Sequence, residues 1–275
     1  MSWILMPAHA IAHVEPTLSV GTAHANYAKG NINTLDPNSQ GRFNPSVGAA
    51  AQLRWDRGEA ITTGNDISGV AFINHNFGNK GQPIALYGGA TAGTTTDTLY
   101  SATPANNKPI FATFTSNLRR HLRLDLGVAA DTDYYCGTFT VGPTYDLGNP
   151  VYGEQWMAGP NANSYQTSVV GTQMYTGSSV GSRVVSAQFR KVTRANANAI
   201  IGYYHQQYIN STLLGSTLIQ GIGGGGGANP IVLKDNDGVV YYGPAEIRAT
   251  SWIGPNCEIQ VTLREVSYPR AYGVP

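Results

Sequence analysis

Apolar and polar residues alternate over short stretches along most of this chain, with turn-forming residues between them. Such stretches predict β-strands, because successive side chains of a strand point to opposite faces. In the first half we expect strands at 51–56, 67–74, 84–87, 110–114, 122–126 and 134–141. In the second half we expect them at 167–175, 182–192, 199–204, 213–220, 231–233, 239–242, 247–253 and 258–266. A helical period never lasts beyond about two turns, so we expect few helices, with 193–203 as a candidate.

The two strand series are separated by residues 142–163, which are dense in Gly, Pro and Asn. This composition is typical of a boundary between domains. We therefore predict an all-β chain with three parts: an N-terminal arm at 1–20, one β-domain at 21–145 and a second, sandwich-like β-domain at 146–275. The spacing of strands and turns is that of a β-sandwich. The glycine run at 223–227 precedes Ala-Asn-Pro and a strand, which indicates a flexible loop and not a phosphate cradle.

The segment ISGVAFINHNF (Ile67–Phe77) is an apolar run that ends in the polar triplet Asn74, His75 and Asn76. Asn side chains bond to neighbouring backbone groups and tolerate left-handed dihedral angles, so they end strands and build tight loops. We expect a buried strand that stops at the triplet. Taken alone, the triplet is compatible with a ligand site or with a structural role.

Charged residues make up 12% of the chain, and the formal net charge is +1. This balance gives no indication of a nucleic-acid groove, and the densest basic spot, Arg119-Arg120-His121, is expected to be a solvated strand start. The low charge suits an all-β protein whose surface is partly covered by neighbouring subunits, or an extracellular one with an uncharged polar surface. No apolar run approaches the ~18 residues of a membrane span, so we expect no membrane insertion. The N-terminus lacks a basic region before its short apolar core, which predicts an uncleaved arm made in the cytoplasm.

Candidate sites for metal or redox chemistry are weak. Cys136 and Cys257 are the two cysteines, and we expect buried, reduced thiols. His9 and His13 are spaced by four residues, but no third ligand stands at a diagnostic distance, so no metal and no cofactor are predicted. Asp235–Gly238 resembles the start of a calcium loop but lacks the later carboxylate, which favours a hairpin turn.

No nucleophile or acid–base pair stands out, so we expect no enzyme. A glycosidase pair could in principle come from carboxylates whose separation cannot be read from the sequence: Asp125, Asp131, Asp133 and Glu154. Adjacent tyrosines recur, and in a strand one ring of each pair should face the core and the other should face out. For a glycan contact the candidates are Trp55 and Trp156.

Several of these features occur in a characteristic order. ISGVAFINHNF is followed by IALYGG, then by NLRRHLRLDL (Asn117–Leu126), and then by CGTFTVGP (Cys136–Pro143). This succession resembles the galactose-binding-like, discoidin-type jelly-roll module found in structural proteins of tailed bacteriophages. The later segments, among them SRVVSAQFRKV and the stretch that ends near Glu265, are similar to the second half of such proteins. His121-Leu122-Arg123 replaces the usual aromatic, and the strand with Trp55 lacks the expected Asp-Leu-Gly.

The resemblance implies a non-enzymatic structural component of a tailed-phage virion, placed at the tail tip or baseplate. Its expected partners are copies of itself and other virion proteins, which would form a ring through β-domain and arm contacts. In this reading His75 packs beneath loops and braces the jelly roll with Asn74 and Asn76. The alternatives are a carbohydrate-binding module for host-surface glycan, and a capsid-decoration or head-to-tail connector protein.

Overall fold

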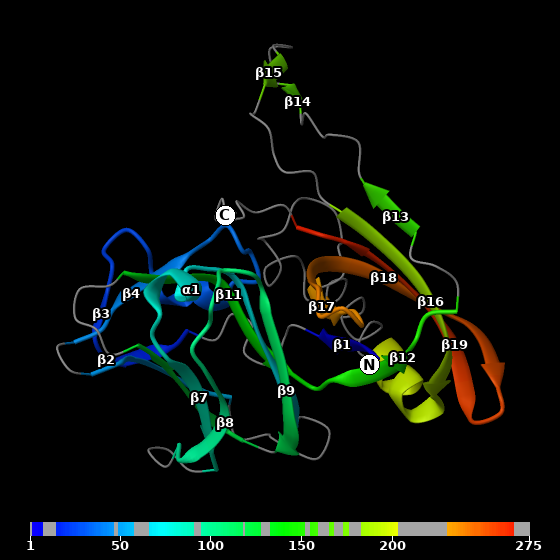
Figure 1. Ribbon diagram of the computed structural model, residues 1–275, viewed down its shortest axis with the longest axis horizontal. Coiled ribbons are helices and arrows are strands. Elements are labelled where there is room, and N and C mark those ends of the chain that lie inside the picture. The colour runs from blue at the N-terminus through cyan, green and yellow to red at the C-terminus, as the bar shows by residue number, and fades with distance from the viewer. Residues whose placement is uncertain are drawn as a thin grey trace, which may run out of the picture. The chain divides into compact units, whose positions relative to one another are not determined.

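The computed structural model describes residues 2–7, 15–46, 49–57, 66–90, 95–117, 119–127, 133–151, 155–158, 165–167, 173–175, 183–202 and 230–266 (Figure 1). Contacts divide the chain into two compact units. One unit contains Leu5–Tyr145, and the other contains the start of the chain and continues from Asp146. The predicted division into an arm and two domains remains a prediction, and each unit is described by itself.

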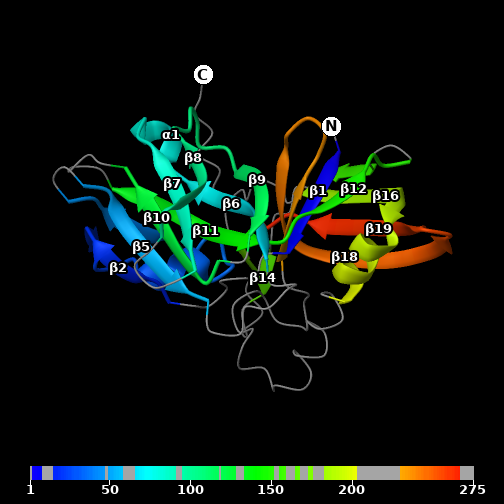
Figure 2. The same cartoon turned by 90° about the horizontal axis from the view of Figure 1, so that it is seen from below.

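The first unit is built from two five-stranded antiparallel sheets (Figures 1 and 2). The sheet that we name the β5 sheet has the order β2-β5-β10-β7-β8, and the β11 sheet has the order β3-β4-β11-β6-β9. The strands of the β5 sheet are β2 (Thr17–Val20), β5 (Ala51–Asp56), β7 (Ile84–Gly89), β8 (Asp97–Ala102) and β10 (His121–Leu126). Those of the β11 sheet are β3 (Thr22–Ala23), β4 (Gly41–Asn44), β6 (Ile67–His75), β9 (Ile110–Asn117) and β11 (Tyr134–Gly142). Two short helices accompany them, η1 (Lys29–Asn33) and α1 (Phe77–Lys80).

The order of these strands identifies the fold. From β4 to β11 the chain moves between the two sheets, which gives the orders β4-β11-β6-β9 and β5-β10-β7-β8. Eight strands connected in this way form the double Greek key of a jelly roll. Strands β2 and β3 extend one edge of each sheet. The sequence prediction of an all-β, jelly-roll fold is confirmed.

The alternation of residues in β5 and β10 explains how the β5 sheet packs. In the pairing of these strands, Leu122 lies opposite Trp55 and Leu124 lies opposite Leu53, and all four side chains are buried. The polar residues between them therefore face outward. Burial of each large apolar side chain stabilises the fold by about 1.5–3 kcal/mol. The same core contains Phe72 and other side chains of the β11 sheet.

Strand β6 is buried along nearly its whole length, unlike the alternating β5 and β10. It lies between β11 and β9, so both of its backbone edges are paired. A continuous apolar run is what a strand covered on both faces requires. The run Ile67–Ile73 meets that requirement, as its sequence predicted.

The second unit contains a seven-stranded sheet with the order β12-β1-β17-β18-β19-β16-β13. Its strands are β1 (Trp3–Pro7), β12 (Tyr145–Gly148), β13 (Gln155–Ala158), β16 (Arg183–Thr193), β17 (Pro230–Lys234), β18 (Val240–Ile253) and β19 (Asn256–Arg264). The long strand β18 pairs with β17 through Val240–Pro244 and with β19 from Ala245 onward. Successive parts of β18 thus pair with different neighbours within the one seven-stranded sheet.

Two strand predictions in this unit were wrong. Of the strand expected at 199–204, the described residues 199–202 are instead part of a helix over 194–202, which confirms the helix candidate at 193–203. Thr193 caps this helix, since its Oγ1 accepts a hydrogen bond from the Asn196 N–H at 3.3 Å. Ala197 and Ile200 share one buried face three residues apart. The single strand expected at 167–175 is instead a pair, β14 (Tyr165–Thr167) and β15 (Gln173–Tyr175). The strand predicted at 213–220 and the glycine run lie outside the described residues.

Candidate functional site

The polar triplet lies at the end of β6, where the sequence placed it. Asn74 has a left-handed φ of 53°, a conformation that Asn tolerates better than other residues with a side chain. Its Nδ2 donates a hydrogen bond of 2.6 Å to the carbonyl oxygen of Pro37. The same loop approaches β11 so closely that a Cβ at Gly137 would lie 2.0 Å from that oxygen. Asn74 therefore holds the 34–40 loop against the β11 sheet.

Asn76 joins the triplet to the last strand of the jelly roll. Its Nδ2 donates to the carbonyl oxygen of Asp133 at 2.7 Å, and its Oδ1 accepts from the N–H of Tyr135 at 2.9 Å. The residue is 7% exposed. One amide side chain thus satisfies two backbone groups at the start of β11 that would otherwise be unpaired.

His75 is 1% exposed, and both of its ring nitrogens are engaged. Nε2 lies 2.9 Å from the carbonyl oxygen of Lys108, which can only accept, so Nε2 carries the proton. Nδ1 accepts from the N–H of Phe77 at 3.3 Å, and the two rings stack with centroids 4.5 Å apart. Burial lowers the pKa of His75 to about 4. The ring is neutral and has no nitrogen left for a ligand.

Trp55 and Trp156 were the two candidates for a glycan contact, and the structure describes the side chain of Trp55 only. Trp55 is 2% exposed, and its ring lies 5.0 Å from that of Phe139 in the core, so it does not face solvent where a sugar could stack. Its position follows from the alternation of β5, in which the tryptophan falls on the inward register. Trp156 lies in β13, whose side chains are outside the described residues. His9 and His13 are also outside them.

A cluster that the sequence did not single out lies on the outward face of the β11 sheet. Arg42 of β4 is the cross-strand neighbour of Tyr135 of β11. Its guanidinium carbon lies 3.9 Å from the ring centroid of Tyr27 and 5.6 Å from that of Tyr135, within the range of cation–π contacts. His24 meets the edge of the Tyr27 ring with centroids 5.2 Å apart. We name Tyr27, Arg42, Asp133 and Tyr135 the Arg42 cluster.

The polar atoms of the Arg42 cluster are only partly satisfied. Arg42 Nη1 lies 3.3 Å from Asp133 Oδ2, and Nη2 donates to Gln40 Oε1 at 3.2 Å. Arg42 Nε and Asp133 Oδ1 are buried and have no hydrogen-bond partner among the described residues, whereas other atoms of both side chains are exposed. The side chains of Arg42 and Asp133 are 28% and 41% exposed. The cluster therefore combines two aromatic rings with a planar donor and an acceptor, at a place that solvent reaches.

The tyrosine pairs divide as expected in β11 but not in β18. Tyr134 is buried and Tyr135 is half-buried on the opposite face, which is the alternation that the sequence predicted. Tyr241 and Tyr242 are both buried. The Tyr241 hydroxyl donates to Asp235 Oδ2 at 2.9 Å, so this ring is held inside by the turn before its own strand.

The carboxylates considered for a glycosidase pair are not brought together in the described residues. Asp125 lies in the β5 sheet beside Arg123, and Asp133 lies at the start of the β11 sheet beside Arg42. Asp131 and Glu154 are outside the described part of the chain. Burial raises the pKa of Asp125, although Arg123 and Arg54 act in the opposite direction.

Asp235 builds the hairpin turn between β17 and β18, which confirms the turn prediction. Its Oδ1 accepts from the N–H groups of Asp237 and Val239 at 2.9 and 2.8 Å. Among the described residues, no group of three or more His, Cys, Asp or Glu side chains is placed to hold a metal ion. Cys136 and Cys257 are free and buried, and burial raises the pKa of each thiol. In the same ranges, no helix has the length and apolar character needed to cross a membrane.

These observations define the protein as a jelly-roll β-sandwich joined to a second β-rich unit. No family model and no curated protein matches the chain. Solved structures that it resembles include chitosan-binding module 1 from a chitosanase/glucanase of Paenibacillus sp. IK-5, with 16% identity, TM-score 0.37, and coverage of 48% of this chain and 96% of that one. The lectin domain of lectinolysin complexed with Lewis B antigen has 14% identity, TM-score 0.39, and coverage of 49% and 95%.

A Streptococcus pneumoniae fucose-binding module has 9% identity, TM-score 0.37, and coverage of 50% and 95%. All three are described as carbohydrate-binding modules or lectin domains, and none is described as a virion protein. All three TM-scores are below 0.5, so the function proposed below rests on the side chains of this chain.

Proposed function

We propose that this chain is a non-enzymatic carbohydrate-binding protein and that its jelly-roll unit binds a neutral glycan at the Arg42 cluster. The observation that carries the proposal is the stacking of the Arg42 guanidinium on Tyr27 beside the outward ring of Tyr135. Aromatic rings offer an apolar face with a polar edge, and a few placed polar groups fix the orientation of a ligand. Sugar rings require both kinds of contact.

The charges of the cluster favour an uncharged ligand. Arg42 is matched by Asp133 at 3.3 Å, so the pair has no net charge. The Arg42 side chain is 28% exposed and that of Asp133 is 41% exposed, so both present surface to a ligand. A guanidinium donates to hydroxyl oxygens and a carboxylate accepts from hydroxyl protons, so neighbouring hydroxyl groups of one sugar suit the pair.

The test is a screen of the purified full chain against immobilised neutral glycans. Tyr27→Ala and Tyr135→Ala should each weaken binding about tenfold, the loss expected for one well-placed aromatic contact. Tyr145→Ala is the matched control, because Tyr145 is a half-buried tyrosine of β12 that lies outside the Arg42 cluster. Thermal unfolding of each variant checks that the fold is intact. The proposal fails if no neutral glycan binds, or if the control loses as much affinity as the two test variants.

A structural role in a phage particle is a second proposal. Strands β8 and β9 form the outer edges of the two jelly-roll sheets in the described residues, and an exposed sheet edge can pair with another chain. The low charged fraction of 12% also suits a surface covered by neighbours. In this proposal the protein stands at the tail tip or baseplate and is made in the host cytoplasm. Mass spectrometry of virions and light scattering at high protein concentration test it, and a stable monomer absent from particles would contradict it.

A further inference from the structure

The outward face of the β5 sheet carries two facing arginines. Arg54 of β5 and Arg123 of β10 are cross-strand neighbours. Both point away from the core because they alternate with inward residues such as Leu53 and Leu122. Like charges directly opposite one another destabilise a sheet unless an anion lies between or beside them. The arrangement therefore calls for a counter-charge.

For one of the two arginines, Arg123, the protein supplies a carboxylate as the counter-charge. Asp125 accepts from Arg123 Nε at 3.0 Å, and Arg123 Nη1 lies 3.4 Å from Thr95 Oγ1. The Arg123 guanidinium also covers the Tyr87 ring at 4.3 Å. Arg123 thus has a carboxylate, a hydroxyl and an aromatic face as partners.

Arg54 has fewer polar partners than Arg123 among the described residues. Its Nη2 makes a long contact of 3.4 Å to Gln52 Oε1, and its buried Nε has no hydrogen-bond partner among the described residues. No described carboxylate lies within ion-pair distance of it. Two guanidinium groups share the single carboxylate of Asp125, which leaves one positive charge unmatched.

Neighbouring arginines show what a matched pair looks like on the same sheet. Arg120 binds Asp56 through two bonds of 2.7 and 2.8 Å, and Arg119 lies 2.5 Å from Asp97. The two arginines of the basic spot noted in the sequence, Arg119 and Arg120, are therefore each paired with a carboxylate. The unmatched charge is that of Arg54, two residues along β5 from Asp56.

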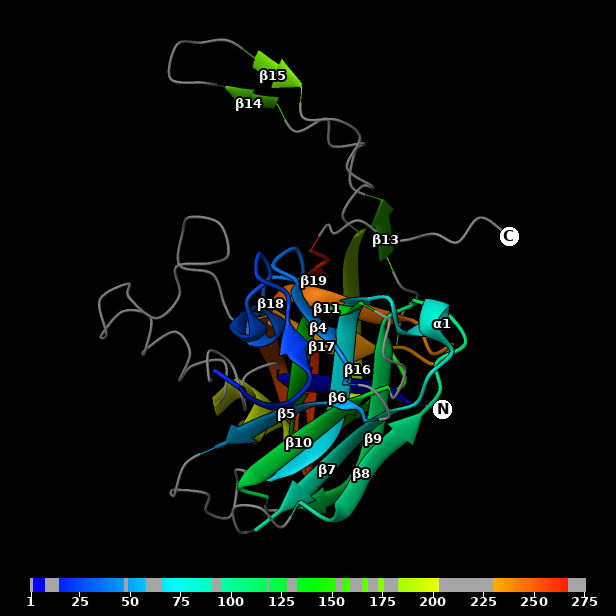
Figure 3. The ribbon, with the colours of Figure 1, turned by 90° about the vertical axis from the view of Figure 1, so that its left-hand side faces the viewer.

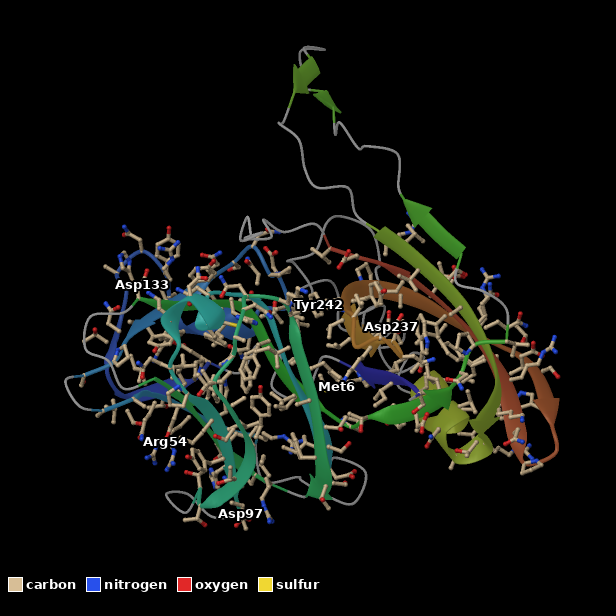
Figure 4. All side chains as sticks on the ribbon, in the orientation of Figure 1. Met6, Arg54, Asp97, Asp133, Asp237 and Tyr242 are labelled. Carbon is tan, nitrogen blue, oxygen red and sulfur yellow. The ribbon has the colours of Figure 1, made fainter. Side chains whose placement is uncertain are left out.

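The row around Arg54 carries the hydroxyl groups of two threonines and one tyrosine. Thr17, Arg54, Arg123, Tyr87 and Thr98 are successive cross-strand partners on β2, β5, β10, β7 and β8. Five strands span roughly 19 Å at the usual spacing. Figure 3 shows β5, β10, β7 and β8 side by side, and in Figure 4 Arg54 lies well apart from Asp133 of the Arg42 cluster.

We propose that this row is a second binding site, which takes an anionic glycan by pairing its carboxylate or sulfate group with Arg54 and Arg123. Arginine binds such groups with two parallel hydrogen bonds, and threonine hydroxyls at either end of the row suit a polyhydroxylated chain. The site is independent of the Arg42 cluster, because it lies on the other sheet and requires a charge.

The experiment measures binding of the full chain to polygalacturonate, dextran sulfate, uncharged dextran and single-stranded DNA at low salt. We expect binding to polygalacturonate or dextran sulfate, and whichever binds identifies the anionic group. Arg54→Gln should weaken that binding about tenfold, whereas Arg120→Gln should change it by less than about twofold because Asp56 already neutralises Arg120. Asp125→Asn should strengthen binding, since both guanidinium groups then face the ligand.

Four outcomes would overturn the proposal. The first is that neither charged polysaccharide binds, and the second is that uncharged dextran binds as well as the charged ones. The third is that Arg54→Gln and Arg120→Gln lose the same affinity. The fourth is that single-stranded DNA binds as well as the charged polysaccharides, which would indicate an unspecific polyanion surface. Melting temperatures of the variants separate lost binding from lost folding. Tyr27→Ala must leave the anionic ligand bound, so failure of the neutral-glycan site and failure of this site are distinguishable.

Discussion

The triplet at the end of β6 and the Arg42 cluster meet at the start of β11, where Asn76 bonds to the backbone of Asp133 and Tyr135, but the two groups of residues differ in how far their polar side chains are buried. In the triplet, the Asn74 and Asn76 amides bond to backbone groups, the two His75 nitrogens are engaged, and the residues are at most 7% exposed. In the cluster, the side chains of Arg42 and Asp133 are 28% and 41% exposed, so solvent or a ligand can reach them. The comparison indicates that a conspicuous polar motif braces a fold when its bonding capacity is used up. A site for a ligand needs capacity left over.

The largest expected effect comes from removing the Asn76 side chain. Asn76→Ala leaves the Asp133 carbonyl and the Tyr135 N–H without partners, and each unsatisfied buried group costs about 1–3 kcal/mol. We expect the free energy of unfolding to fall by about 2–6 kcal/mol. Urea unfolding measures it. Asn26→Ala, a substitution at an exposed position, should change the value by less than about 0.5 kcal/mol. Equal effects of the two substitutions would remove the distinction between bracing and surface amides.

A similar effect should appear on acidification. The pKa of His75 is lowered from 6.5 to about 4, so the unfolded chain binds the proton more readily than the folded protein. The stability contributed by neutral His75 is complete above pH 6.5 and is lost as the pH falls toward 4. The loss should approach about 3 kcal/mol. Unfolding of the wild type and of His75→Gln across this range measures it, because the variant lacks the titrating ring. Parallel curves for the two proteins would show that His75 does not titrate in this way.

A smaller and different effect is expected at the cluster. Arg42→Lys keeps the positive charge beside Asp133 but loses the planar group that stacks on Tyr27. The free energy of unfolding should change by less than about 1 kcal/mol, because the ion pair is partly exposed. Binding of the neutral glycan should fall several-fold, which titration of the ligand measures. A variant that binds normally, or that unfolds as readily as Asn76→Ala, would place Arg42 with the bracing residues.

The sequence predicted the backbone of the jelly roll well because alternation is a local property. The inward register of Leu53, Trp55, Leu122 and Leu124 can be read from the spacing of apolar residues, and the pairing of β5 with β10 follows the same register. The stop of β6 at Asn74 was also local, because it depends on the conformational tolerance of one residue. Near residue 200 the sequence supported two competing expectations, a helix candidate at 193–203 and a strand at 199–204. The helix is the one that forms, with Thr193 as its cap and Ala197 and Ile200 on its buried face.

The candidate sites depended on contacts between distant parts of the chain. Tyr27 and Arg42 meet Tyr135 and Asp133 across more than 90 residues, as the separation of 91 between Arg42 and Asp133 shows. Whether Trp55 faced a sugar or the core was fixed by which sheet covered it. Whether Arg54 kept its charge unmatched was fixed by which residue stood opposite. Composition and alternation determined an all-β chain of low charge, because both properties depend only on the residues themselves and on their neighbours in the sequence. The tertiary structure alone decided which polar groups use up one another's hydrogen bonds and which remain available, because that depends on partners brought together from separate strands.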